Sequence, residues 1–346
     1  MRLIVQNIIY RILTFTLLLF LINYVYVHFF YDKDLAKHSD LIAIIDKIPD
    51  STDILYVAES SNTALAEDDI DRRTIAEFLD EALPGQKVND LTKPAAHAGI
   101  YKVLLSAIPE TSNIKTIVLT LNLRSFNAQW IHSSLETSLQ KSLVFLKTES
   151  PLLNRFLLSF KGYPIKSERE QEAAFKAKWL ADPLQFPYNF EHQNVSEWDY
   201  WMAINGVKND DGTTNQALTE LACHYIKGYG FQIDTLTNPR ISDFNEIIQL
   251  CRERNWHLVL NLLAENVEKA EILVGSDLTY LMDYNRDLLV AYYSRKGVLV
   301  VDNLETVPDK YFIDQNWTTE HYSDAGRKAV AEKVASVIEQ NAKLFK

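Results

Sequence analysis

Short apolar segments that end abruptly in polar residues restrict this chain to few folds. Residues 54–58 are a run of β-forming residues followed at once by Glu59, Ser60 and Ser61. Nearly continuous apolar runs that alternate with helical stretches are typical of parallel strands covered on both faces. The sequence therefore predicts a three-layer α/β/α sandwich with about five parallel strands. The other expected strands are 87–91, 114–121, 256–263 and 297–302.

The N-terminal part of the chain has a different character. Residues 12–30 are almost entirely apolar and would rise about 29 Å as a helix, which matches the hydrocarbon core of a bilayer. Arg2 and Arg11 precede this segment, so the positive-inside tendency places residues 1–11 in the cytoplasm. Bulky residues at 27–30 do not fit the cleavage site of a secretory signal peptide. We therefore expect an uncleaved single-pass anchor in the inner membrane, with the remaining chain on the extracytoplasmic, periplasmic side.

The rest of the chain is expected to divide into a stalk and one domain. Residues 31–52 are polar and mixed, which indicates a stalk, and residues 53–346 contain all the expected strands. Within this domain the strand–helix alternation lapses from about 127 to 212, a segment with four tryptophans. An unstructured loop of this length is rare, so we expect a helical or irregular insertion. Its aromatic side chains fit either a substrate groove or the insertion's own core.

Charge and cysteine content limit the function classes. The net charge of −11 argues against a nucleic-acid partner, because phosphate binding requires clustered basic residues. Cys223 and Cys251 are the only cysteines and form either a disulfide or two separate buried thiols. No cysteine or histidine cluster has the spacing of a zinc site, and we expect neither a metal nor another cofactor.

Polar residues are expected to gather at one edge of the sheet. Ser60 and Ser61 follow the first strand, and Asn122 and Arg124 follow the third. The carboxyl ends of parallel strands border the ligand crevice in such sheets, although serines at a strand end also serve as turn and capping residues. His321 lies before the C-terminal helix and close after acidic residues, which favours a general base.

The order of these residues resembles the SGNH (GDSL-like) hydrolase superfamily. Ala58-Glu59-Ser60 stands where that family has Gly-Asp-Ser, and Thr120-Leu121-Asn122-Leu123 stands where it has Gly-x-Asn-Asp. His321 is followed five residues later by Gly326, as in the family's last block. The resemblance covers roughly residues 53–346 and implies a flavodoxin-like sheet and a serine hydrolase or acyltransferase.

The resemblance also implies roles for individual residues. Ser60 would be the nucleophile and His321 the base. Asn122 would donate to the oxyanion, together with the Ser60 amide and a backbone amide near Ala98 and Gly99. Donors of this kind must be in place before the reaction, because negative charge develops on the substrate oxygen.

One position departs from the family pattern. Members usually carry Asp three residues before the histidine, but this chain has Thr318 there. Asp314 is the first choice for a replacement acid and Glu320 the second, and a Ser–His dyad or an impaired site are the alternatives. Ser61 is a second choice for the nucleophile, and Arg124 is a further candidate site residue.

A single anchor followed by an SGNH-like domain is similar to accessory proteins that modify cell-envelope polymers beside membrane-bound O-acyltransferases. Examples are the D-alanyl transfer protein of teichoic acids and the alginate acetylation proteins. This similarity implies an envelope-side serine esterase or O-acyltransferase, an acylated glycan or lipid as substrate, and a membrane-bound O-acyltransferase as partner. The alternative is a catalytically degenerate module that binds polymer or scaffolds such an acyltransferase, which Thr318 favours. A third interpretation is an anchored α/β domain unrelated to acyl transfer.

Overall fold

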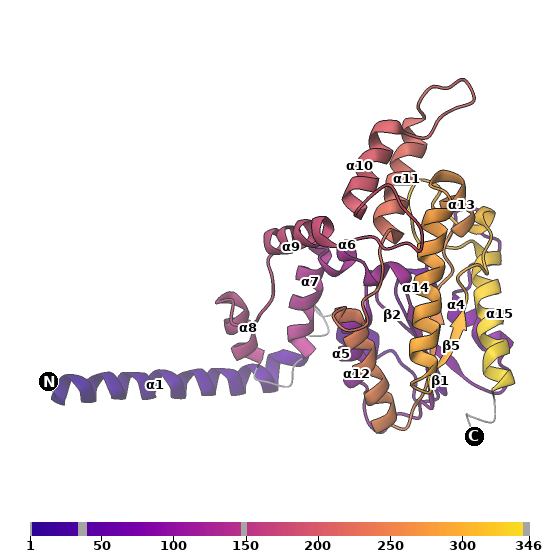
Figure 1. Ribbon diagram of the computed structural model, residues 1–346. Coiled ribbons are helices and arrows are strands. Elements are labelled where there is room, and N and C mark those ends of the chain that lie inside the picture. The colour runs from indigo at the N-terminus through magenta and orange to yellow at the C-terminus, as the bar shows by residue number, and fades with distance from the viewer. Residues whose placement is uncertain (1, 34–39, 147–150, 342–346) are drawn as a thin grey trace.

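A computed structural model describes residues 2–33, 40–146 and 151–341 of the chain. These residues contain one five-stranded parallel sheet with helices on both faces (Figure 1). The strand order, β2-β1-β3-β4-β5, is that of flavodoxin-like doubly wound sheets. The predicted three-layer α/β/α fold is therefore confirmed. The strands are β1 (Ile54–Ala58), β2 (Val88–Thr92), β3 (Thr116–Leu121), β4 (His257–Leu262) and β5 (Leu299–Asp302).

Alternate side chains of each strand enter separate cores on the two faces of the sheet. Leu55 and Val57 belong to the larger core, which packs against α5 (Ala98–Ser106), α11 (Gln216–Tyr229), α12 (Pro239–Glu253) and α14 (Ser276–Ser294). Ile54 and Tyr56 belong to the smaller core, which packs against α4 (Ile75–Ala82) and α15 (Asp324–Gln340). Because β1 and β3 are buried on both faces, their sequences are almost continuously apolar.

The chain changes direction across the sheet at β1. This strand pairs with β2 on one side and with β3 on the other. After β2 the chain therefore returns past β1 to begin the other half of the sheet. The carboxyl ends of β1 and β3 lie at this switch point, which is where open α/β sheets bind ligands.

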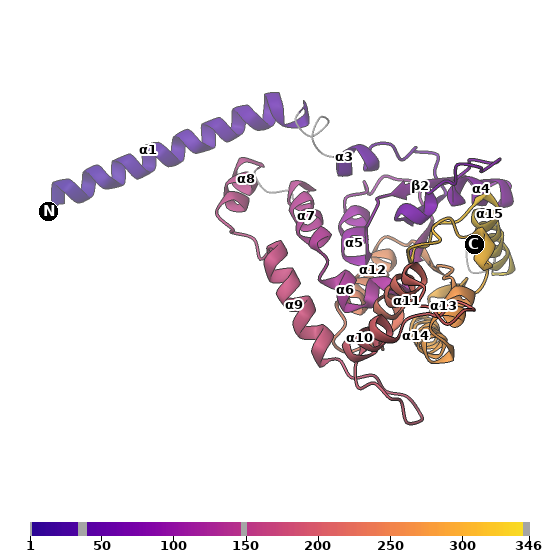
Figure 2. The same cartoon turned by 90° about the horizontal axis from the view of Figure 1, so that it is seen from above.

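The segment that follows β3 is mainly helical and forms an arm beside the sheet (Figure 2). Its tryptophans lie in different surroundings: Trp198 is buried in the larger core, Trp179 packs against that core, and Trp201 is exposed. Cys223 in α11 and Cys251 in α12 are separate buried thiols, not a disulfide. The arm contains α6 (Ala128–Ile131), α7 (Ser134–Leu143), α8 (Pro151–Ser159), α9 (Glu168–Ala181) and α10 (Val195–Asn205).

The N-terminal helix projects from the domain in both views (Figures 1 and 2). It consists of α1 (Arg2–Tyr26) and a π-helical turn, Val27–Tyr31, and it is long and apolar enough for a membrane span or a signal sequence. The helix therefore begins before the predicted span. After it, α3 (Asp40–Ile45) buries Leu41 and Ile45 in the larger core, so this part of the expected stalk packs with the domain.

Candidate active site

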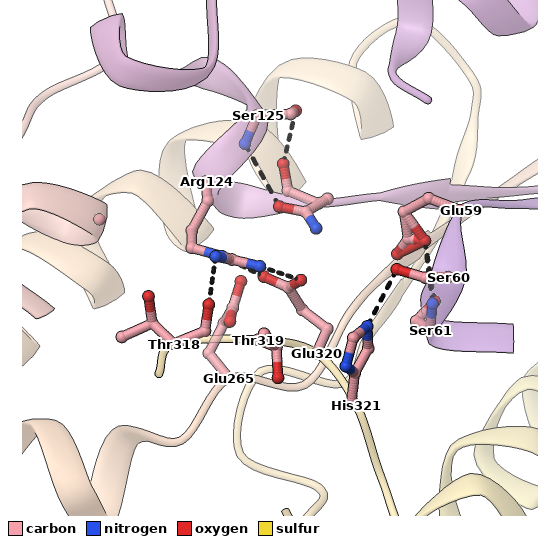
Figure 3. Close-up of polar contacts among 12 residues, drawn as sticks. Glu59, Ser60, Ser61, Arg124, Ser125, Glu265, Thr318, Thr319, Glu320 and His321 are labelled. Atoms are coloured by element: carbon pink, nitrogen blue, oxygen red, sulfur yellow. Dashed lines mark hydrogen bonds and ion pairs between the residues drawn. The ribbon is translucent and has the colours of Figure 1, made fainter. Parts of the chain in front are cut away.

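Ser60 begins a 3-10 turn, Ser60–Asn62, directly after β1. The Glu59 carboxylate caps this turn by accepting the Ser61 amide at 3.3 Å and the Ser61 hydroxyl at 3.1 Å. Ser61 is therefore buried and held by Glu59, whereas Ser60 borders a cleft and points towards His321 (Figure 3). The local geometry thus distinguishes two serines that the sequence left as alternatives.

The loop before α15 brings His321 and Asp314 to Ser60. Nε2 of His321 lies 2.9 Å from Ser60 Oγ, and Nδ1 lies 2.8 Å from Asp314 Oδ2. A carboxylate only accepts hydrogen bonds, so Nδ1 donates to Asp314 and Nε2 is left to accept the serine proton. The Thr319 hydroxyl donates to the same Asp314 oxygen at 2.5 Å. The structure therefore joins Ser60, His321 and Asp314 in one hydrogen-bonded chain.

Asn122 follows β3 and borders the same cleft. Its Oδ1 accepts the Ser125 amide at 3.2 Å and thereby caps the 3-10 turn Leu123–Phe126. Within the described ranges, neither Asn122 Nδ2 nor the Ser60 amide has a hydrogen-bond partner. Two N–H groups are thus left for a ligand, and donors of this type stabilise a developing oxyanion.

The expected donor near Ala98 and Gly99 is not at the cleft. His97 is the N-cap of α5, and its Nδ1 accepts the Gly99 amide at 3.1 Å, while Ala98 is buried in the first turn of the helix. Ala95, Ala96 and His97 border the cleft instead. Ala95 has a left-handed φ of 59°, a strained conformation for a residue with a Cβ and one that is frequent at functional sites.

Four ionisable side chains lie buried beside this hydrogen-bonded chain. Arg124 forms an ion pair with Glu320 and also donates to the backbone carbonyl of Thr318 (Figure 3). Glu59 and Glu265 are the other two, and each is less than a tenth exposed. Glu320, the second choice for the acid, therefore pairs with Arg124 and not with the histidine. Thr318 contributes its carbonyl oxygen to this arrangement.

Burial changes the charge that these carboxyls carry. Desolvation and the negative charge of Glu320 raise the pKa of Glu59 to about 7. Burial and the same neighbour also raise the pKa of Glu265 well above its ordinary value, and this carboxyl accepts the Tyr229 hydroxyl at 2.5 Å. Burial opposes ionisation of Glu320 as well, but the Arg124 charge outweighs it and lowers the Glu320 pKa. Near neutral pH, the buried cluster thus contains the ion pair of Arg124 and Glu320 together with two carboxyls, those of Glu59 and Glu265, that bind protons.

The cleft at Ser60 has a volume of about 150 Å³ and two tryptophans on its walls. Trp130 lies 5.3 Å from the Arg124 guanidinium, and Trp317, which is 45% exposed, lies 3.8 Å from the ring of His224. The sequence indicated Trp130 only as one of the insertion's aromatic residues. Trp317 and Thr319 were not singled out, because a loop sequence does not show which side chains turn towards the cleft.

A second charged cluster at the cleft wall was also missed from the sequence. His97 Nε2 donates to Glu136 at 2.6 Å, and Arg240 lies 3.5 Å from the same carboxylate. Burial lowers the pKa of His97, which agrees with a neutral ring whose Nδ1 accepts a hydrogen bond. His97 caps α5, Glu136 lies in α7 and Arg240 lies in α12, and no spacing along the chain indicates that they meet.

A larger cleft, of about 700 Å³, lies between α9 and the start of α12, and none of Ser60, Asp314 and His321 borders it. The hydroxyl, imidazole and carboxylate described above therefore mark the smaller cleft as the candidate active site. Within the part of the chain that the structure describes, no three His, Cys, Asp or Glu side chains gather in a way that could hold a metal ion.

No protein-family model and no curated protein matches this chain. Among solved structures, the chain is similar to a GDSL-like lipase from Bacteroides thetaiotaomicron VPI-5482. The two sequences are 7% identical, the alignment covers 91% of this chain and 98% of the lipase chain, and the TM-score is 0.30. The function is therefore inferred from this chain's own side chains.

Proposed function

We propose that this chain is a serine esterase or O-acyltransferase that works through an acyl-enzyme at Ser60. The observation that carries the proposal is the hydrogen-bonded chain from Ser60 through His321 to Asp314. An arrangement of this kind allows a neutral hydroxyl to lose its proton while it attacks a carbonyl carbon. The resemblance of the sequence around these residues to SGNH hydrolases supports the same conclusion.

In the first half of the reaction, Ser60 Oγ forms a bond to the carbonyl carbon of the ester, and His321 Nε2 takes the hydroxyl proton. Asp314 keeps the imidazole in the required tautomer and stabilises its positive charge. The Asn122 Nδ2 group and the Ser60 amide donate to the oxyanion. The intermediate then expels the alcohol, which receives the proton from Nε2, and the acyl group remains on Ser60.

In the second half, a hydroxyl compound attacks the acyl carbon and gives its proton to His321 Nε2. The bond between this carbon and Ser60 Oγ then breaks, and Nε2 returns the proton to the serine oxygen. Attack by water completes an ester hydrolysis, whereas attack by a sugar or lipid hydroxyl completes an O-acyl transfer. Trp130 and Trp317 on the cleft walls offer flat apolar surfaces on which a sugar ring or an acyl chain can pack. We therefore propose an acylated glycan or lipid as the substrate class.

The N-terminal helix supports the proposal that this reaction takes place at the inner membrane. We propose that the helix spans the bilayer with residue 1 in the cytoplasm and the domain on the extracytoplasmic side, because Arg2 and Arg11 precede most of the apolar segment. A membrane-bound O-acyltransferase is the proposed partner, as a donor of acyl groups in the same bilayer. Co-purification of a multi-span acyltransferase with the tagged full-length chain tests this partner.

A fluorophosphonate probe tests the acyl-enzyme directly, because it reacts with serines that an adjacent base activates. We expect the probe to label the full-length protein at Ser60 and to leave the Ser60→Ala variant unlabelled. Ser61→Ala is the matched control: Ser61 is the neighbouring serine, but its hydroxyl donates to Glu59 and does not reach His321. This variant should be labelled as the wild type is.

Labelling that persists in Ser60→Ala would remove Ser60 as the nucleophile. If the folded wild-type protein is not labelled at all, and a Ser60→Ala, His321→Ala double mutant still supports the cellular function, the chain is a non-catalytic module that binds polymer or scaffolds the acyltransferase. The residue that first favoured this alternative was Thr318, but His321 has a carboxylate partner in Asp314. The geometry therefore favours catalysis.

A further inference from the structure

Helix α8 exposes apolar side chains and buries a polar one. Leu153, Phe156 and Phe160 are 48%, 58% and 71% exposed, and their spacing of three and four residues places them along one side of the helix. Asn154 is only 3% exposed, and it accepts a hydrogen bond from the Tyr163 hydroxyl. A helix that faces water has the opposite arrangement, with its polar side outward.

The charge of the same segment differs from that of the whole chain. The protein has a net charge of −11, yet residues 151–167 contain no aspartate or glutamate. Lys161 and Lys166 follow the helix and are both exposed. Exposed aromatic and aliphatic residues flanked by lysines are typical of helices that lie in the headgroup region of an anionic bilayer.

Helix α8 also lies against the candidate membrane span. Residues of α1 and α8 are in contact, and the two helices are neighbours in both views (Figures 1 and 2). Asn23, Tyr26, Val27 and Tyr31 are partly buried, in contrast to the exposed remainder of this apolar helix. A bilayer that surrounds the helix would therefore meet α8 at the end of the span nearest to the domain.

We propose that α8 and the turn after it form a second membrane contact, which inserts Leu153, Phe156 and Phe160 among the lipids of an anionic bilayer. Burial of these side chains removes apolar area from water, and the lysines contact lipid phosphates. Two attachments fix the orientation of the domain, whereas a single helix leaves it free to rotate about the anchor. Along the chain α9 follows α8, and α9 contacts α6, which carries Trp130 at the cleft.

Site-directed spin labelling of the full-length protein tests this contact. Cys223 and Cys251 are replaced by alanine, and a nitroxide is attached to a new cysteine in Phe156→Cys. The protein is reconstituted in vesicles of phosphatidylcholine and phosphatidylglycerol, and collision rates with lipid-soluble oxygen and with a water-soluble nickel chelate are compared. Phe20→Cys in the apolar helix is the lipid reference, and Ile272→Cys in α13 (Val267–Leu273) is the water reference, because Ile272 is 75% exposed.

We expect the ratio of oxygen to nickel collisions at 156 to exceed the ratio at 272 severalfold and to approach the ratio at 20. A ratio at 156 equal to that at 272 would place α8 in water and overturn the proposal. Protection from both reagents would overturn it as well, because it would mean that another protein surface covers the helix. The measurement does not depend on catalysis, so it stands apart from the proposed function.

Discussion

Asp314 lies at the Nδ1 side of His321, where the usual acid three residues before the histidine is absent. We expect Asp314→Asn to lower kcat by about 10⁴-fold, because the amide can hold the imidazole in the wrong tautomer and cannot stabilise its charge. Turnover of p-nitrophenyl acetate and the rate of fluorophosphonate labelling measure the effect. Glu305→Gln also replaces a carboxylate with an amide, but on an exposed side chain after β5, and it should leave both rates unchanged. A loss of less than tenfold in Asp314→Asn would point to a Ser–His dyad.

Glu59 makes stability depend on pH near neutrality. Its folded pKa of about 7 lies above the ordinary value of 4.5, because burial and Glu320 disfavour the charged form. The folded state therefore holds this proton more tightly than the unfolded state. The stability that results is fully present below about pH 4.5 and is lost as the pH rises through about 7.

Glu59→Gln removes this titration and keeps an acceptor for Ser61. The free energy of unfolding of the wild type should fall relative to that of the variant as the pH is raised from 5 to 8. We expect the difference between the two proteins to change by roughly 2 kcal/mol in favour of the variant. Urea unfolding in detergent at the two pH values measures the difference. Glu110→Gln, at an exposed position, is the matched control. A constant difference between Glu59→Gln and wild type across this range would contradict the assignment.

Individual site residues were predictable to different degrees. Ser60, Asn122 and His321 stand beside strand ends or a helix start, where local sequence patterns are informative, and Asp314 was the nearest acid with room to reach the imidazole. The donors expected at Ala98 and Gly99 were misplaced, because the sequence does not show that a histidine caps α5 and occupies the Gly99 amide. The hydrogen bond from the Gly99 amide to the His97 ring is visible only in the folded chain.

At the scale of elements, one ion pair connects β3 to the histidine loop. Arg124 follows β3 and Glu320 precedes His321, and both are about 5% exposed or less. Removal of one partner leaves a buried charge without compensation. We therefore expect Arg124→Met and Glu320→Gln each to reduce the free energy of unfolding by about 3–5 kcal/mol, and the double variant to lose clearly less than the sum.

Urea unfolding in detergent measures the free energy of unfolding of the wild type, the two single variants and the double variant. The exposed pair of Lys176 and Glu172 in α9 provides the control, and Lys176→Met should leave the free energy of unfolding almost unchanged. Additive effects of the two buried substitutions would mean that Arg124 and Glu320 act independently. Because Arg124 also holds the Thr318 carbonyl, we expect the single variants to lose labelling at Ser60 as well.

Elements of the sheet were more predictable than those of the arm. Parallel strands buried on both faces read as apolar runs, so all five were located to within a few residues. The arm lacks such runs, although the capping box of Ser167 and Glu170 marks the start of α9 and could have been recognised. The contact between Arg124 and Glu320 joins residues 196 positions apart, and no sequence period indicates a pair at that separation.

At the scale of the whole molecule, the apolar N-terminal helix and the acidic domain determine where the site can act. The helix projects from the domain in both views (Figures 1 and 2), and most of its large apolar side chains are exposed, so the fold gives them no core to enter. The proposed bilayer would supply one. The distribution of Arg2 and Arg11 then favours a cytoplasmic N-terminus.

We therefore expect the full-length protein to remain in the inner-membrane fraction after alkaline extraction, and a C-terminal alkaline phosphatase fusion to be active. That enzyme needs an oxidising compartment to form its disulfides, so activity reports export of the domain. A fusion directly after Arg11 is the control and should be inactive, because it ends before most of the apolar segment. An inactive C-terminal fusion, with protease reaching the domain only from the cytoplasmic side, would place Ser60 away from envelope polymers. The chain would then need a cytoplasmic ester as substrate.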